Sequence, residues 1–251
     1  MTGEHIWSDW VNRLLGQHKY ITYRKDIYRT NPIPETYSQW ITNGFNLRAK
    51  VVCKECNNGW MSDLENTHAK PVITRMVLSQ EKLFLSEAER RSLAAFAFKV
   101  AVVADHLRLD RGSRPFFSPS ARRVFSRTLL IPPNVQMWVS TLTNDPGPAA
   151  LCKLVYHQKR GGGTGGLQLY VLTYVLADIL LQVAAFRWRS PTRRMRTEGK
   201  LTQAPEMNSV AFQLWPYDGK PLIWPAGSKV GRHQINDVAY RWRRLVVPLS
   251  M

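Results

Sequence analysis

Cysteine is scarce in this sequence, and its scarcity limits the classes of protein to which the chain can belong. Only 3 of the 251 residues are cysteines, and two of them, Cys53 and Cys56, form one C-x-x-C pair. A small secreted domain that depends on disulfide bonds needs several such pairs. This class is therefore excluded, and we expect a reducing, cytoplasmic setting.

Long apolar segments free of polar residues are absent as well. The longest apolar stretch, residues 167–186, is interrupted by Gln168, Thr173, Asp178 and Gln182, and polar groups are costly inside a bilayer. Its first half is rich in Tyr, Val, Thr and Leu, which favours a buried strand. The first residues show no basic leader followed by an apolar run and a cleavage site. We therefore expect neither a secretory signal nor a membrane partner.

Acidic residues are also few compared with basic ones. The chain has 35 Lys and Arg against 18 Asp and Glu, which gives a formal net charge of +17. Arginine donates two parallel hydrogen bonds to phosphate from its planar fork, and nucleic acid presents closely spaced phosphates. We expect DNA or another nucleic acid as the partner, with an acidic membrane surface or simple solubility as the alternatives.

The clearest secondary-structure signal is a helix over residues 85–107. An S-x-x-E capping box, formed by Ser86 and Glu89, opens this helix. Leu93 and Phe96 begin an apolar stripe at helical spacing. The pattern predicts a long helix with one buried face.

Strand-like runs make up most of the chain after this helix. A shorter helix over residues 118–130 comes first, and the Gly-rich residues 159–166 lack the G-K-[ST] ending of a phosphate loop, so we expect a hairpin connection there. The order predicts an α+β fold with an antiparallel sheet. The predicted strands cover residues 134–142, 150–158, 167–176 and 178–188. The last elements cover residues 209–216, the Pro-bounded residues 220–227 and a basic helix over residues 233–245.

The N-terminal part of the chain has a different pattern. A short helix is expected over residues 7–15, whereas Pro, Asn and Gly punctuate residues 22–46, which predicts a loop with little regular structure. A brief apolar strand, a cysteine turn and a helix follow from Ala49, and Pro71 is expected to disturb this helix. We end this first module near residue 75.

Two fragments of the first module matter together. Glu4 and His5 stand side by side, and the sequence CKECNNGW follows from Cys53. They resemble the HNH endonuclease family, also called ββα-metal nucleases, in which an acidic residue and a histidine precede an apolar strand and a C-x-x-C-N that opens a helix. The stretches EHIWSDWVNRLL and VVCKECNNGWMSDLE look like a bacterial branch of that family. The resemblance implies an HNH-like ββα-metal module over residues 1–75, then an α+β domain over residues 76–251 that shapes the substrate channel or binds a partner.

The resemblance also implies roles for individual residues. It makes His5 the general base that takes a proton from the attacking water. It makes Glu4 and Asn57 ligands of one divalent metal, with Asn58 as the alternative ligand. Charge develops on oxygen during phosphodiester cleavage, and a hard cation neutralises it while an imidazole supplies the base. Carboxylate and amide oxygens suit Mg²⁺ or Mn²⁺.

The cysteine pair is compatible with a structural zinc (Zn²⁺) site. Cys53 and Cys56 supply two of the four ligands that such a site needs. Many family members carry a first C-x-x-C before the acidic residue, whereas only three residues precede Glu4 here. Either the start of the sequence omits that pair, or the two cysteines merely pack. His68 is a candidate replacement ligand, and Cys152 is expected to be a buried apolar residue.

A second basic feature lies beyond the strand-like runs. The sequence FRWRSPTRRMRTEGK, residues 186–200, interleaves arginines with Phe186 and Trp188. This mixture suits contact with a nucleic-acid backbone, and a solvated basic loop is the alternative. His106 and His233 lie at helix ends, where capping or surface roles are expected. The predicted nucleic-acid-binding residues are Arg187, Arg189, Arg193, Arg194 and Arg196.

The sequence as a whole predicts a hydrolase, namely a metal-dependent HNH endonuclease that cleaves DNA phosphodiester bonds. Resemblance to stand-alone HNH proteins adds a role in bacterial antiviral defence and control by a partner protein. Two alternatives stay open. One is a catalytically inactive nucleic-acid-binding protein that retains the HNH scaffold, and the other is a peripheral membrane protein bound through residues 167–186.

Overall fold

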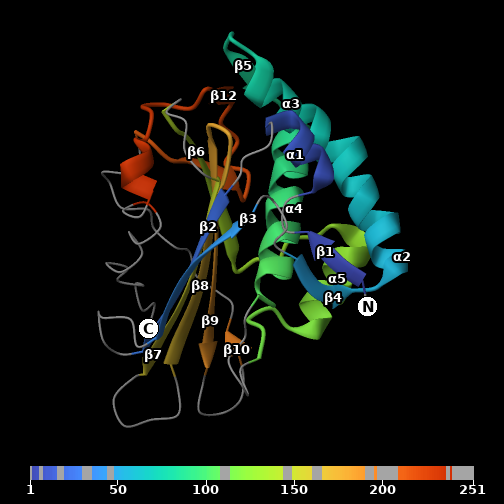
Figure 1. Cartoon of the computed structure of the whole chain (residues 1–251), viewed down its shortest axis with the longest axis vertical. Helices are drawn as coiled ribbons and strands as arrows, with labels where there is room; N and C mark the ends of the chain where they lie inside the picture. The colour runs from blue at the N-terminus through green and yellow to red at the C-terminus, as the bar shows by residue number, and fades with distance from the viewer. Residues whose placement is uncertain are drawn as a thin grey trace.

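The computed structural model describes residues 2–5, 8–15, 20–29, 36–43, 48–107, 114–143, 149–159, 166–189, 195–196, 209–235 and 238. These residues form an α+β fold arranged in layers (Figure 1). A large sheet forms one layer, and helix α4 (Glu87–Ala104) lies against it. The other side of α4 is covered by N-terminal helices and by a small sheet of β1 (Thr2–His5) and β4 (Arg48–Val52). No helix in the described residues is long and apolar enough to cross a bilayer.

Helix α4 begins at the capping box that the sequence predicts. The Ser86 hydroxyl accepts a hydrogen bond from the Glu89 N–H at 3.3 Å, and Glu89 Oε2 accepts one from the Ser86 N–H at 2.8 Å. Most of α4 is buried, because the helix lies between the large sheet and the outer layer. The shorter predicted helix is confirmed as α5 (Pro119–Thr128), which Ser118 caps.

Replacing Ser86 by alanine is expected to lower the free energy of unfolding by about 1 kcal/mol, because the Glu89 N–H loses its acceptor. Ser92→Ala is the matched control on the same helix, since the Ser92 hydroxyl donates to the Ala88 carbonyl and caps no helix end. Urea unfolding measures both variants. Equal stability of the two would show that the capping box contributes nothing.

The large sheet contains the long strands that the sequence predicts after α4. Its strands are β2 (Tyr20–Arg29), β3 (Thr36–Asn43), β6 (Val135–Thr141), β7 (Ala149–Lys159), β8 (Gly166–Leu176), β9 (Ile179–Arg189), β10 (Met195–Arg196) and β11 (Phe212–Trp215). Their order is β11-β6-β9-β8-β7-β2-β3, and β10 pairs with β9. Lys159 lies opposite Gly166 in the antiparallel β7–β8 pair, which confirms the hairpin, although residues 160–165 lie outside the described residues.

Two strands occupy the segment for which the sequence analysis predicted a loop. Residues 22–46 contain most of β2 and all of β3, which pair antiparallel with each other. The prediction is wrong because Tyr, Ile and Thr favour strands, and because the partner of β2 is β7, far along the chain. The β2–β7 pair is parallel, so the sheet is mixed and the prediction of an antiparallel sheet needs this correction.

The outer layer is mainly helical. Helix α1 (Asp9–Leu15) confirms the short N-terminal helix. From Lys54 the chain is helical in four segments, of which the two central ones are π-helical, and Pro71 lies in the first turn of the last segment. The disturbance predicted at Pro71 is a change of helix type, because the π-helical segment ends at Ala69 and the chain continues as an α-helix with Pro71 in its first turn. The four segments are α2 (Lys54–Cys56), η1 (Asn57–Met61), η2 (Leu64–Ala69) and α3 (Lys70–Leu78).

The two remaining short strands lie at one end of the outer layer (Figure 1). Strand β5 (Leu83–Leu85) pairs antiparallel with β12 (Leu222–Trp224). The indole N–H of Trp224 donates to the Met76 carbonyl at 2.9 Å and ties β12 to α3. A single 3-10 turn, η4 (Arg232–Gln234), follows. Most of the predicted basic helix over residues 233–245 lies outside the described residues.

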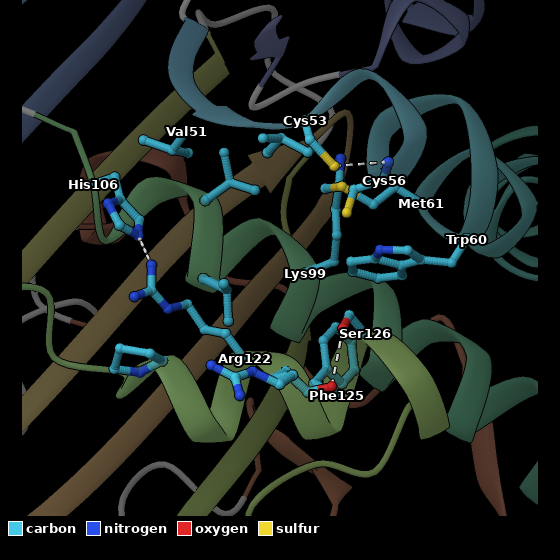
Figure 2. A pocket seen from close by; sticks show the side chains of 15 residues that line it. Val51, Cys53, Cys56, Trp60, Met61, Lys99, His106, Arg122, Phe125 and Ser126 are labelled. Atoms are coloured by element: carbon cyan, nitrogen blue, oxygen red, sulfur yellow. Dashed lines mark hydrogen bonds between the residues drawn. The ribbon is translucent and has the colours of Figure 1, made fainter. Parts of the chain in front are cut away.

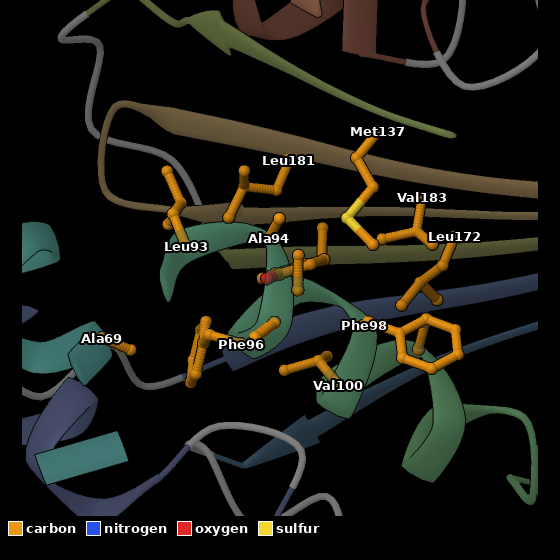
Figure 3. Close-up of a cluster of buried hydrophobic side chains, with 14 of the residues drawn as sticks. Ala69, Leu93, Ala94, Phe96, Phe98, Val100, Met137, Leu172, Leu181 and Val183 are labelled. Atoms are coloured by element: carbon orange, nitrogen blue, oxygen red, sulfur yellow. The ribbon is translucent and has the colours of Figure 1, made fainter. Parts of the chain in front are cut away.

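One hydrophobic core joins the layers (Figure 3). Phe96 of α4 packs on Trp10 of α1 with ring centroids 6.0 Å apart, and Phe98 packs on Phe125 of α5 at 4.7 Å. The core therefore draws on chain from both sides of the boundary that the sequence suggested near residue 75. From the sheet it includes Met137, Leu172, Leu181 and Val183.

Candidate functional site

Strand pairing places the first fragment, Glu4-His5, beside β4, the strand that precedes the second fragment. Glu4 lies opposite Ala49, and His5 lies opposite Arg48. Strand β4 ends at Val52, and the helical segments begin directly afterwards. Strand pairing thus brings the backbone of Glu4 and His5 beside the strand that leads into the cysteine turn. For these two residues the structure describes the backbone and not the side chains.

The cysteine turn has a defined local geometry. Cys53 has an extended backbone and caps the helix, because its sulfur accepts the Cys56 N–H at 3.2 Å. The Asn57 N–H donates to the Cys53 carbonyl at 3.0 Å. Asn57 is half-buried, whereas Asn58 is exposed. A hydrogen bond with Cys53 raises the pKa of the Cys56 thiol, burial raises it further, and Trp60 opposes both.

A cavity of about 370 Å³ lies between the cysteine turn, α4 and α5, and we call it the Cys-turn cavity (Figure 2). In this view His106 and Arg122 lie on the side opposite Cys56 and Trp60. Its charged or titratable lining residues besides the cysteines are Lys99, His106, Arg122 and Arg123, and among the described side chains no Asp or Glu lines it. Its apolar wall consists of Val51, Val52, Trp60, Met61, Val102, Val103, Pro119 and Phe125. The cavity therefore combines an apolar surface with positive charge.

The cationic groups of the cavity differ in their availability. Lys99 is fully buried, and its ammonium donates to Glu65 at 2.6 Å, so a carboxylate balances this charge. Arg122 bonds to Nε2 of His106. Because a guanidinium can only donate, the His106 ring must accept at Nε2 and is neutral. The arginines of α5 therefore carry the positive charge that a ligand would meet.

The neutral state of His106 predicts how stability depends on pH. Burial, Arg122 and Lys153 lower the pKa of His106 to about 4 from its ordinary value of 6.5. The folded state then binds fewer protons than the unfolded state between about pH 6.5 and about pH 4, so stability is expected to fall as the pH drops through this window. The variant His106→Gln keeps an acceptor for Arg122, and its stability should fall less than that of the wild type over this pH range. Urea midpoints at several pH values measure the difference.

Asp105, the residue before His106, has the opposite effect on how stability depends on pH. Burial raises the pKa of this carboxyl despite its partner Lys153, so protonation of Asp105 favours the folded state as the pH falls. Comparing wild type with His106→Gln cancels this contribution, because both proteins contain Asp105. Identical pH dependence of the two proteins would contradict the role given to His106.

The described side chains do not complete a zinc site. Within the described part of the chain, no group of three or more His, Cys, Asp and Glu side chains could hold a metal ion. His68 lies in η2, where its Nε2 is 3.9 Å from Asp63. Cys53 and Cys56 therefore offer two thiols where a structural zinc site needs four ligands, and these donors alone do not fit zinc.

The structure describes the side chain of only one of the five predicted nucleic-acid-binding arginines, Arg187. Arg187 donates to Gln168 Oε1 at 2.5 Å and to the Phe116 carbonyl at 2.7 Å, and its guanidinium lies 4.6 Å from the Phe116 ring centre. Its hydrogen bonds thus stabilise the packing of β9 against β8 and Phe116. Arg189 and Arg196 lie in the β9–β10 pair, for which the structure describes the backbone of these arginines and not their side chains. Arg193 and Arg194 lie outside the described residues.

Sequence reasoning missed the part of the site that α5 supplies. It assigned His106 an ordinary capping or surface role, whereas His106 lines the Cys-turn cavity together with Arg122. One signal was available: the helix PSARRVFSRT contains three arginines and no acidic residue. Comparisons with family models, curated proteins and solved structures gave no match. The functional argument therefore depends on the geometry and chemistry of the site.

Proposed function

We propose that this protein is a metal-dependent endonuclease of the HNH type that hydrolyses DNA phosphodiester bonds. The observation that carries the proposal is the β1–β4 pair. It joins the strand containing Glu4 and His5 to the strand that leads directly into Cys53 and Asn57. Residues that are far apart in the sequence thereby belong to one local unit of two strands and a helix start.

The donor set of this unit suits a divalent cation. A carboxylate from Glu4 and an amide oxygen from Asn57 are hard ligands of the kind that Mg²⁺ and Mn²⁺ prefer. When bound, such an ion would neutralise the negative charge that develops on the phosphate oxygens. Asn57 is half-buried at the start of the helix, where the backbone bond to Cys53 fixes its position.

The chain itself supplies the proton transfer and the substrate binding. His5 takes a proton from the attacking water, which requires a neutral imidazole near the phosphate. Arg122 and Arg123 line the Cys-turn cavity beside the same cysteine turn and suit phosphate oxygens. The formal net charge of +17 favours a polyanionic substrate over a neutral one.

Supercoiled plasmid separates this proposal from its main alternative. With Mg²⁺ or Mn²⁺ present, the purified protein is expected to convert supercoiled plasmid to nicked circles. Retarded migration of a plasmid that stays supercoiled would favour a nucleic-acid-binding protein without cleavage activity. Plasmid that is neither bound nor nicked would count against both functions.

A further inference from the structure

Helix α5 is a basic element next to the proposed active site. Its sequence contains Arg122, Arg123 and Arg127 and no acidic residue. Arg123 and Arg127 are exposed and lie about one helical turn apart. No ion pair involves either of them within the described residues. This face of α5 therefore keeps its charge available for an anion.

The apolar wall of the Cys-turn cavity suits a flat, uncharged group. Trp60 is half-buried and packs on Phe125 with ring centroids 5.5 Å apart, and both residues line the cavity. The indole N–H of Trp60 interacts with the Cys56 sulfur beside the cavity, and sulfur is a weak acceptor that an oxygen or nitrogen of a ligand would replace. A nucleobase offers both a stacking surface and hydrogen-bond acceptors.

The size of the cavity restricts what can enter. A volume of about 370 Å³ is near the lower end of the range of small-molecule pockets, which suits a single nucleotide better than a duplex. A base inside a duplex is paired and stacked, and it must leave the stack before it can enter such a pocket. The positive charge of Arg122 and Arg123 in the cavity lining favours an occupant that carries negative charge.

We propose that the Cys-turn cavity and the arginine face of α5 bind one unpaired nucleotide of a single-stranded DNA segment. The base contacts Trp60 and the apolar wall, and the flanking phosphates contact Arg122 and Arg123. This inference deepens the proposed nuclease function and rests on it for its biological meaning, since it makes single-stranded or distorted DNA the preferred substrate. It names a substrate class and adds binding residues that the sequence analysis did not identify.

Binding without metal tests the inference separately from cleavage. Fluorescence anisotropy in EDTA compares a labelled oligothymidine with a labelled hairpin duplex of equal nucleotide number. The single strand is expected to bind more tightly. Trp60→Leu should weaken its binding by roughly tenfold, in line with the loss of one stacked base. Equal or tighter binding of the duplex would overturn the inference.

Arg123→Gln provides a second test at an exposed position that does not threaten folding. It is expected to weaken single-strand binding and to reduce the slope of log K against log salt by about 0.7, the value for one phosphate contact on a single strand. Arg91→Gln is the matched control, because Arg91 is exposed on α4, pairs with Glu87 and does not line the cavity. Identical slopes for the two variants would overturn the inference.

The outcomes distinguish this inference from the proposed function. A protein that nicks plasmid but binds both probes equally retains the nuclease function and loses the single-strand site. A protein that prefers the single strand but never nicks plasmid retains the site and loses the nuclease function.

Discussion

Replacing His5 by alanine is expected to lower the rate of plasmid nicking by about 10²- to 10⁴-fold, the usual contribution of a general base. Water is a poor nucleophile until a base removes its proton, and alanine has no group that can do so. His5 lies in β1, opposite Arg48 at the start of β4. Because strand pairing is a backbone interaction, the substitution should leave the thermal midpoint nearly unchanged.

His233→Ala is the matched control for the His5 variant. His233 is exposed in η4 and has no part in the Cys-turn cavity, so this variant should nick plasmid at the wild-type rate. If His5→Ala nicked plasmid as fast as His233→Ala, His5 would not be the base. Restoration of activity by added imidazole would support the assignment further.

Replacing Lys99 by methionine is expected to lower the free energy of unfolding by about 3–5 kcal/mol, because it leaves one charge of a buried pair without its partner. Lys99 Nζ lies 2.6 Å from Glu65 Oε1, and both side chains are almost inaccessible to solvent. The pair joins α4 to η2, directly after the cysteine turn. Its loss should therefore destabilise the outer layer against the rest of the core.

The double variant Lys99→Met with Glu65→Gln separates charge from packing. Removing both charges takes away the unpaired carboxylate, so most of the stability lost in the single variant should return. Urea unfolding of the wild type, the single variant and the double variant measures this. A loss below about 1 kcal/mol in the single variant, within the range of exposed pairs, would contradict the account of a buried ion pair.

Features with a local cause were predictable from the sequence. The capping box of Ser86 and Glu89 depends on residues three positions apart, and β8 and β9 are apolar, β-favouring runs next to each other in the chain. Strands β2 and β3 pair with each other, but they were not predicted, because the Pro, Asn and Gly residues in this segment are typical of loops and the other partner of β2, β7, lies far along the chain. At Pro71 the helix changes from π-helical to α-helical, and the sequence did not show that the chain stays helical beyond this proline.

Some residues of the candidate site were predictable from the sequence, and others were not. The Glu4-His5 pair and the cysteine turn were identified from their residues, and the β1–β4 pairing places Glu4 and His5 beside the strand that precedes the cysteine turn. The contribution of α5 was missed, because the contact between Arg122 and His106 depends on how the chain turns back after α4. The described donors around Cys53 and Cys56 do not form the zinc site that their spacing left open.

The metal requirement of cleavage tests the central claim most directly. Protein treated with a chelator is mixed with supercoiled plasmid, Mn²⁺ is then titrated in, and nicked circles are quantified against time. The account predicts no nicking before Mn²⁺ is added and a rate that rises to saturation with Mn²⁺. Nicking that continues unchanged in excess chelator, or plasmid that stays supercoiled at saturating Mn²⁺, would contradict it.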